Sequence, residues 1–130
     1  MRIEQQLSVF LENRPGTLAS MCEQLAAEDI NIVALSVGDT ADYAVVRLVV
    51  DRPDRAVHVL GEAGTLVVEN DVAVVKVDNR IGALGEMAEK LRQADINIDY
   101  AYCTAAPEQS TATLVFRTPD PQKVVAALQK

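Results

Sequence analysis

Two short segments of the chain carry asparagine, arginine and glycine at the same spacing, a combination that could bind a small charged molecule. They are ENRPGTL at residues 12–18 and DNRIGAL at residues 78–84. An asparagine amide offers both a hydrogen-bond donor and an acceptor, which suits a zwitterion. Arginine has no special φ preference, so its recurrence as Arg14 and Arg80 is harder to explain by turn geometry. The repetition therefore indicates either a shared turn or a shared ligand.

Both segments stand where a predicted strand passes directly into a predicted helix. A helix start presents free backbone N–H groups, and with the helix dipole they favour an anion such as a carboxylate by roughly 0.3 to 1 kcal/mol. Gly16 and Gly82 lack the Cβ that would block close approach, and they permit positive φ. A strand-to-helix turn also needs Asn, Pro and Gly when no ligand binds, so both interpretations stay open.

The segments belong to a longer internal repeat. A shift of 66 positions aligns residues 5–64 with residues 71–130 without gaps, and the sequence DINI at 29–32 returns at 95–98. We therefore predict two modules, residues 1–70 and residues 71–130, with almost no linker between them.

Each module is predicted to follow the order β-α-β-β-α-β, and the fold class is α+β with two tandem ferredoxin-like modules. Right-handed crossovers place both helices on one face of an antiparallel sheet ordered 4-1-3-2. Strands are expected in the first module at 6–11, 32–37, 43–50 and 65–69, and in the second at 72–77, 98–103 and 111–117. One face of the first helix carries Leu18, Met21, Cys22, Leu25 and Ala26, and Leu84, Met87, Ala88 and Leu91 repeat this stripe.

The second helix of each module is expected to begin at a proline. Pro53 and Pro119 suit the first helical position, and Asp51 and Thr118 are placed to cap the free N–H groups.

The second module is predicted to lack its last strand, because nothing in the sequence repeats residues 65–69. Its first strand, Asp71–Val77, would then be a bare apolar edge, which soluble proteins normally cover. Either residues 65–69 fold back over it through a turn at Asn70-Asp71, or another chain supplies the cover. Both alternatives favour an assembly, and a partner module is also expected to cover the apolar run Val33–Leu35.

Two further asparagines, Asn31 and Asn97, begin the second strand of each module. In this topology Asn31 should lie at the opposite end of its module from Asn13. Pairing of two modules about a two-fold axis could bring Asn13 of one near Asn31 or Asn97 of another, which would create a site between modules.

The segments ENRPGTLASMCEQLAAEDINI and DNRIGALGEMAEKLRQADINI resemble the opening half of the ACT domain, the small-molecule sensor module of amino-acid metabolism. The resemblance covers both copies and implies a βαββαβ fold, paired modules and an amino acid bound between them. With the recurring arginines added, the candidate ligand-binding residues are Asn13, Arg14, Gly16 and Asn31, and Asn79, Arg80, Gly82 and Asn97.

The resemblance has two departures. Some members carry a His two residues before the loop asparagine, where this chain has Leu11 and Val77, which argues against a serine-like mode of ligand binding. Ile81 replaces the usual Pro in the second copy, so the second site is altered or silent.

Composition excludes several classes of function. The 12 Lys and Arg against 19 Asp and Glu give a formal charge of −7, which argues against a nucleic-acid partner. No apolar run approaches the roughly 20 residues that span a bilayer, and no signal peptide is recognised. Cys22 and Cys103 are expected to be reduced core thiols in a cytoplasmic protein, and neither a metal cluster nor a cofactor motif is found.

The sequence predicts a non-catalytic regulatory protein that binds a free amino acid or a similar small zwitterion, forms a homodimer, and acts on its own assembly or on a metabolic enzyme. The alternative is a regulatory or assembly subunit of such an enzyme with vestigial ligand sites. A small enzyme is disfavoured, because no nucleophile, base and orienting group stand at a recognisable spacing. His58, the single histidine, is expected to have a surface or packing role and no acidic partner at helical spacing.

Overall fold

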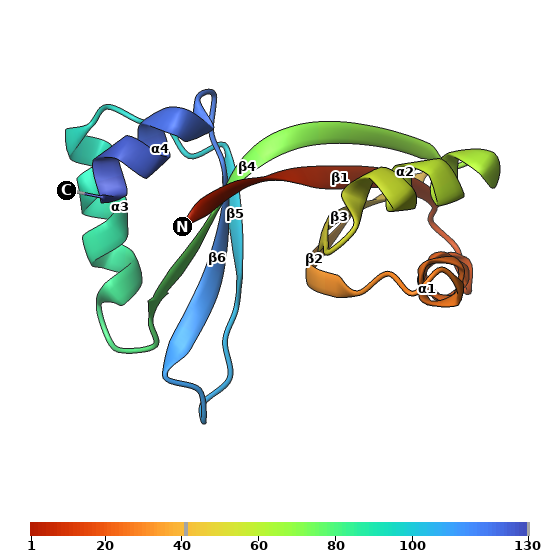
Figure 1. Cartoon of the computed structure of the whole chain (residues 1–130), viewed down its shortest axis with the longest axis horizontal. Coiled ribbons are helices and arrows are strands. Elements are labelled where there is room, and N and C mark those ends of the chain that lie inside the picture. Colours follow the sequence, from red (N-terminus) through yellow and green to blue (C-terminus); the bar gives the residue numbers. More distant parts are fainter. Residues whose placement is uncertain (41, 130) are drawn as a thin grey trace. The chain divides into compact units, whose positions relative to one another are not determined.

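The predicted order of helices and strands is present in the computed structural model, which describes residues 1–40 and 42–129 (Figure 1). The strands are β1 (Arg2–Glu12), β2 (Ile32–Asp39), β3 (Tyr43–Val50), β4 (Leu66–Asp78), β5 (Tyr100–Thr104) and β6 (Thr111–Arg117). The helices are α1 (Thr17–Ala27), α2 (Pro53–Glu62), α3 (Ala83–Gln93) and α4 (Pro121–Leu128). The α+β fold class is therefore confirmed.

The chain divides into two units, which we call the first and the second module. The first module is Gln5–Asn70, and the second combines Met1–Glu4 with the chain from Asp71 onward. The division at Asn70-Asp71 is where the predicted modules 1–70 and 71–130 meet. Residues 1–4 lie with the second module, whereas the sequence assigned them to the first.

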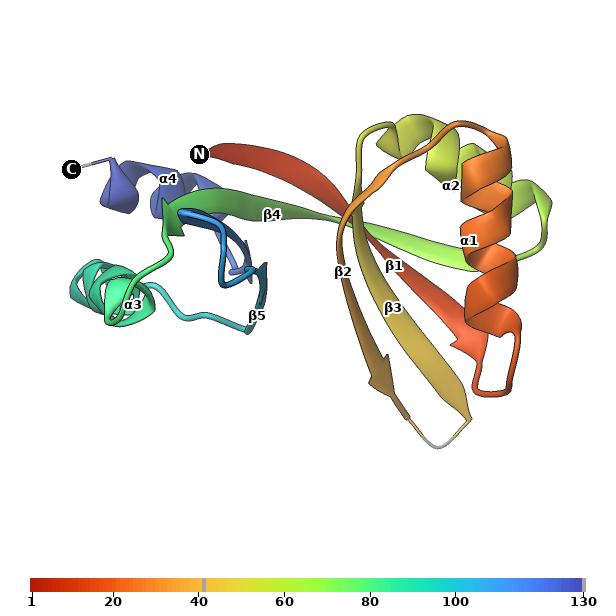
Figure 2. The ribbon, with the colours of Figure 1, turned by 90° about the horizontal axis from the view of Figure 1, so that it is seen from below.

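The first module has the predicted sheet order 4-1-3-2, because its strands follow one another as β2-β3-β1-β4. Strand β3 is antiparallel to both β1 and β2, with Leu48 opposite Leu7 and Leu35 (Figure 2). Leu7 and Leu48 share one buried cluster with Leu25 of α1 and Leu60 of α2. Both helices therefore cover the same face of this sheet, as a ferredoxin-like fold requires.

The second module also has four strands, and its fourth strand is the beginning of β1. Strand β4 is flanked by β1 on one side and by β6 on the other, and β5 follows β6. Residues 2–4 thus occupy the position that the absent last strand would fill. Both alternatives predicted for the edge at Asp71–Val77 are wrong: β4 is one continuous strand with no turn at Asn70-Asp71, and the cover comes from the chain itself.

The core of the second module matches that of the first. Phe116, Leu114 and Val75 from the strands pack with Leu91 of α3 and Val124 of α4. Helices α3 and α4 therefore cover one face of this sheet as well.

The predicted apolar stripes are only partly correct, because their alanines, Ala26 and Ala88, and their first leucines are exposed. Met21 and Leu25 of α1 are buried, as is Leu91 of α3, but Leu18 is 39% exposed and Leu84 is 54% exposed. Leu18 and Leu84 stand in the first turn of their helices, two residues after the glycine at each helix start.

The predicted helix caps are also wrong. The Asp51 carboxylate accepts a hydrogen bond from the N–H of Asn31 at 2.9 Å, and helix α2 begins without a side-chain cap. Helix α4 begins at Pro121, two residues later than expected, so its cap is Asp120 rather than Thr118.

The two cysteines differ in environment. Cys22 packs against the core of the first module, as expected, whereas Cys103 on β5 is exposed, so its assignment to the core is wrong. Among the described residues, no group of three or more His, Cys, Asp or Glu could hold a metal ion. No helix in the same part of the chain has the length and apolar character needed to cross a bilayer.

His58 has an acidic partner, contrary to expectation. Its Nε2 lies 3.1 Å from a carboxylate oxygen of Glu62, one helical turn further along α2. Both side chains are more than half exposed, so the surface role expected for His58 is consistent with its position.

Candidate functional site

The turn between β1 and α1 is built from its own backbone and from the β2–β3 connection. The N–H of Asn13 donates to the carbonyl of Asp42 at 3.2 Å, and the N–H of Arg14 donates to that of Glu12 at 2.9 Å. Gly16 then begins the helix with φ at +92°, in the left-handed region. A Cβ added there would meet no atom within 4 Å, so φ rather than lack of space requires glycine.

Gly82 begins α3 in the same conformation, with φ at +86°. The positive φ predicted for both glycines is therefore confirmed. Neither helix start has a side-chain cap.

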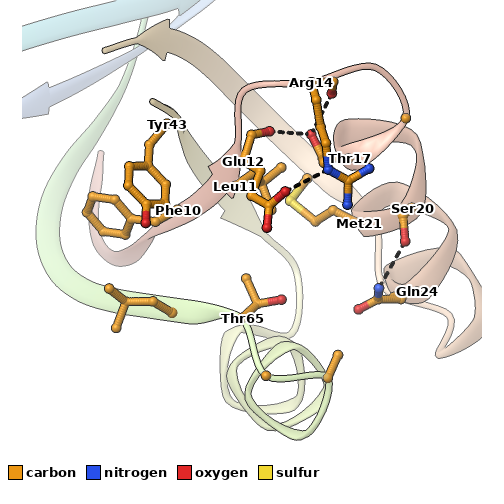
Figure 3. A pocket seen from close by; sticks show the side chains of 14 residues that line it. Phe10, Leu11, Glu12, Arg14, Thr17, Ser20, Met21, Gln24, Tyr43 and Thr65 are labelled. Carbon is orange, nitrogen blue, oxygen red and sulfur yellow. Dashed lines mark hydrogen bonds and ion pairs between the residues drawn. The ribbon is translucent and has the colours of Figure 1, made fainter. Parts of the chain in front are cut away.

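An open pocket of about 830 Å³ lies beside this turn in the first module (Figure 3). Its polar wall comes from the loop and from one face of α1, and its apolar wall comes from the ends of three strands and from α1. The polar side chains are Glu12, Arg14, Thr17, Ser20, Gln24 and Thr65, and the large apolar side chains are Phe10, Leu11, Met21, Tyr43 and Leu66.

Arg14 is the one cation that lines this pocket among the described residues. Its Nε donates to the Glu12 carboxylate at 2.7 Å, and within residues 1–40 and 42–129 its two terminal nitrogens make no hydrogen bond. The Thr17 hydroxyl donates to the carbonyls of Glu12 and Arg14, which closes the turn. The first turn of α1 holds no acidic residue, so this helix start has no carboxylate of its own.

Gln24 and Ser20 form the polar floor next to α1. The Gln24 Nε2 donates to the Ser20 Oγ at 3.2 Å, as the dashed line in Figure 3 shows. The Gln24 Oε1 is buried and has no hydrogen-bond partner in the described part of the chain. Since buried polar atoms are nearly always paired, this oxygen is an acceptor that lacks its expected partner among the described residues.

The second module has a smaller pocket at the matching place, with a volume of about 260 Å³. Its polar lining consists of Lys76, Asp78, Arg80, Glu86 and Lys90, and the last four stand 66 positions after Glu12, Arg14, Ser20 and Gln24. The repeat has therefore conserved the place of the pocket but changed the charges around it.

Arg80 is fully engaged by carboxylates of its own module. Its NH1 and NH2 groups donate to the two oxygens of Glu86 at 3.1 and 2.6 Å, and its Nε lies 3.7 Å from Asp78. The hydrogen bonds from Arg80 lower the pKa of the Glu86 carboxyl and raise the pKa of the Arg80 guanidinium. Both groups are therefore charged at neutral pH.

The predicted ligand asparagines do not line either pocket. The Asn79 amide donates to the carbonyls of Ala106 and Gln109, both at 2.9 Å, so it holds the β5–β6 loop in place. The Asn97 amide donates to Asp99 at 2.9 Å. For Asn79 the turn interpretation therefore describes the side chain best.

Asn13 and Asn31 lie at opposite ends of the first module, as the topology predicted. The N–H of Asn13 bonds to Asp42, just before β3, whereas Asn31 bonds to Asp51, just after β3. One module alone cannot bring these two asparagines together.

The sequence missed the polar face of α1. Thr17, Ser20 and Gln24 recur at helical spacing of three and four residues. Because the apolar stripe beside them was the stronger periodic signal, they were not considered, although their spacing from Gly16 places them on the loop side of the helix.

Comparison with known proteins identifies the family. The sequence matches the family described as ACT domain pair over residues 1–129. The chain belongs to this ACT domain pair family. The ACT resemblance drawn from the repeated segments is confirmed, and no curated protein matches the chain.

Several solved structures are similar to this ACT domain pair. Protein BT0572 from Bacteroides thetaiotaomicron superposes with a TM-score of 0.91 at 33% sequence identity, over 98% of this chain and 87% of that one. The regulatory subunit of aspartate kinase from Thermus thermophilus, in its ligand-free form, has a TM-score of 0.70 at 16% identity, over 99% and 96% of the two chains.

Aspartate kinase from Synechocystis has a TM-score of 0.64 at 19% identity; the match covers 98% of this ACT domain pair and 26% of the kinase. At these identities the two aspartate kinase structures show the shared fold alone.

Proposed function

We propose that this chain is a non-catalytic regulatory protein whose first module binds a free amino acid or a similar small zwitterion. The observation that carries the proposal is the guanidinium of Arg14. It lines a pocket beside the start of α1 with its terminal nitrogens unbonded in the described part of the chain. A carboxylate there would pair with Arg14 and interact favourably with the helix start.

The remaining lining suits the other parts of an amino acid. The Glu12 carboxylate and the unpartnered Gln24 Oε1 can accept hydrogen bonds from an ammonium group. Phe10 and Tyr43 lie on the same face of the sheet, because Tyr43 pairs with Glu12 two residues further along β1. With Leu66 they favour a ligand whose own side chain is uncharged.

The proposal includes pairing of two copies of the chain. Asn31 can reach a ligand only from another copy, since it lies at the far end of its own module. The edge strand β2 follows Asn31 directly, and its side chains Val33, Leu35 and Val37 are exposed. A second copy that covers this edge would bury them and carry Asn31 toward a neighbouring pocket.

The regulatory role is supported by membership of the ACT domain pair family, whose fold also occurs in a regulatory subunit of aspartate kinase. A ligand would alter the assembly of the chain or its docking to a metabolic enzyme, and about 1–3 kcal/mol of coupling is enough for such control. Affinities from micromolar to millimolar correspond to roughly 8 to 4 kcal/mol, which a paired carboxylate and a buried side chain can supply.

Thermal unfolding in the presence of each of the twenty L-amino acids tests this function. We expect a small subset to raise Tm, because a ligand at a hundred times its Kd stabilises the folded state by about 2.7 kcal/mol. Substitution of Arg14 by alanine should remove the increase, and alanine at Asn13 or Asn31 should reduce it.

The control is alanine at Arg92, which forms a similarly exposed ion pair with Glu89 on α3, outside both pockets. This variant should keep the response. If no amino acid changes Tm up to the millimolar range, the proposal is wrong, and the alternative of a subunit with vestigial ligand sites takes its place.

A further inference from the structure

The two pockets stand at equivalent positions of the repeat, yet their arginines have different partners. In the first module the Glu12 carboxylate accepts a hydrogen bond only from the Nε of Arg14. In the second module the Glu86 carboxylate accepts hydrogen bonds from both terminal nitrogens of Arg80, and Asp78 lies near the Nε of Arg80. The two terminal nitrogens of each arginine are the ones that could bind a ligand carboxylate. Within the described residues, those of Arg14 make no hydrogen bond, whereas those of Arg80 are hydrogen-bonded to Glu86.

Glu86 stands in the first turn of α3, and its counterpart in α1 is Ser20. A carboxylate in the first turn compensates the positive end of the helix dipole. The start of helix α3 is therefore compensated by the carboxylate of its own Glu86. The start of α1 has no such residue and would be compensated by the carboxylate of a bound ligand. The N–H of Ala83 is also engaged, since it donates to the carbonyl of Arg80 at 3.3 Å, whereas Thr17 closes its turn through its hydroxyl.

The available space favours the same difference. The pocket of the second module has a volume of about 260 Å³, against about 830 Å³ in the first. Lys76 and Lys90 also line the smaller pocket. The barrier to a ligand carboxylate there is therefore the small volume and the occupation of Arg80 by Glu86, and not the net charge of the lining.

We propose that the two pockets of one chain are not equivalent: the first accepts a carboxylate ligand at Arg14, whereas in the second Glu86 occupies Arg80 in its place. The residue at the position shared by Ser20 and Glu86 thereby determines which module binds. This inference rests on the proposed function and adds to it that each chain binds one ligand.

Equilibrium dialysis tests the inference. The protein is dialysed against a mixture of the twenty L-amino acids, each at millimolar concentration, and amino-acid analysis of both compartments gives the amount bound. The wild-type chain should retain about one equivalent in total. The Ser20→Glu variant supplies the first module with a carboxylate for Arg14 and should retain almost none. The Glu86→Ser variant frees Arg80 and should retain about two.

Two controls separate these effects from a change of charge. Ala19→Glu adds the same charge to the neighbouring exposed position of α1, and Glu89→Ser removes an acid from the same helix as Glu86. Both should retain one equivalent. Circular dichroism shows whether each variant is folded. If the Glu86→Ser variant does not fold, the binding measured for Ser20→Glu alone tests the inference.

The outcomes distinguish this inference from the function on which it rests. Two equivalents on the wild-type chain, or unchanged binding by Ser20→Glu, would overturn the inference while amino-acid binding stands. A single equivalent on folded Glu86→Ser would show that the Arg80–Glu86 pair is not what closes the second pocket, and would overturn it too. No retention by the wild-type chain would end both the proposed function and the inference.

Discussion

Alanine in place of Leu25 or Leu91 is expected to lower the free energy of unfolding by about 2–5 kcal/mol in each case. Both leucines are almost completely buried, Leu25 between helices and strands of the first module and Leu91 in the second. They are equivalent positions of the repeat. Removal of either side chain should therefore leave a cavity in one module that the surrounding strands and helices cannot close. Urea denaturation would measure the resulting loss of stability.

The matched controls are Leu18→Ala and Leu84→Ala, seven residues earlier in the same helices. These leucines belong to the apolar stripe that the sequence predicted, but in the structure they are partly exposed. Their replacement should cost less than about 1 kcal/mol, because little apolar surface is removed from water at these sites. Equal losses at the buried and the exposed leucines would contradict the packing described above.

Removal of residues 1–4 is expected to destabilise the second module selectively. These residues supply the strand beside β4 in that module. Each backbone hydrogen bond contributes about 0.5–1.5 kcal/mol, so the loss should reach about 2–3 kcal/mol. Hydrogen exchange of the amides at residues 72–77 should accelerate at least tenfold, while amides of α1 and of residues 7–11 should keep their protection.

The double variant Arg2→Ala and Glu4→Ala is the control for this deletion. It removes the ion pair between the two side chains, at 2.6 Å, but leaves the backbone of the strand intact. Exchange at residues 72–77 should then stay close to that of the wild type. Unchanged exchange after the deletion itself would mean that β1 does not complete the second sheet.

The internal repeat made most of the fold predictable. Two copies of one pattern, each with a helix between β-rich segments, left few topologies once right-handed crossovers were required, and β3 and β6 were placed correctly to the residue. The origin of the fourth strand of the second module could not be inferred. The segment 2–4 adds only three residues to that sheet. Its pairing with β4, almost 70 residues away in the chain, leaves no local pattern in the sequence.

The candidate site was predictable only where backbone geometry governs it. Gly16 and Gly82 were identified because positive φ restricts the residue type. Asn79 was assigned to a ligand, yet its amide satisfies two loop carbonyls, a role that an asparagine in a turn also fills. The pair Arg80–Glu86 spans a loop and a helix start, six residues apart, so helical periodicity does not reveal it.

The central claim is that the pocket beside the start of α1 binds an amino acid. Its most direct test is an NMR titration of the nitrogen-15-labelled chain with the amino acid that raises Tm most. We expect progressive, saturable shifts of the amide signals of Gly16, Thr17 and Ser20, with Gly82 and Glu86 unchanged. Signals of Gly16, Thr17 and Ser20 that stay fixed through the millimolar range, or shifts confined to the second module, would contradict the account.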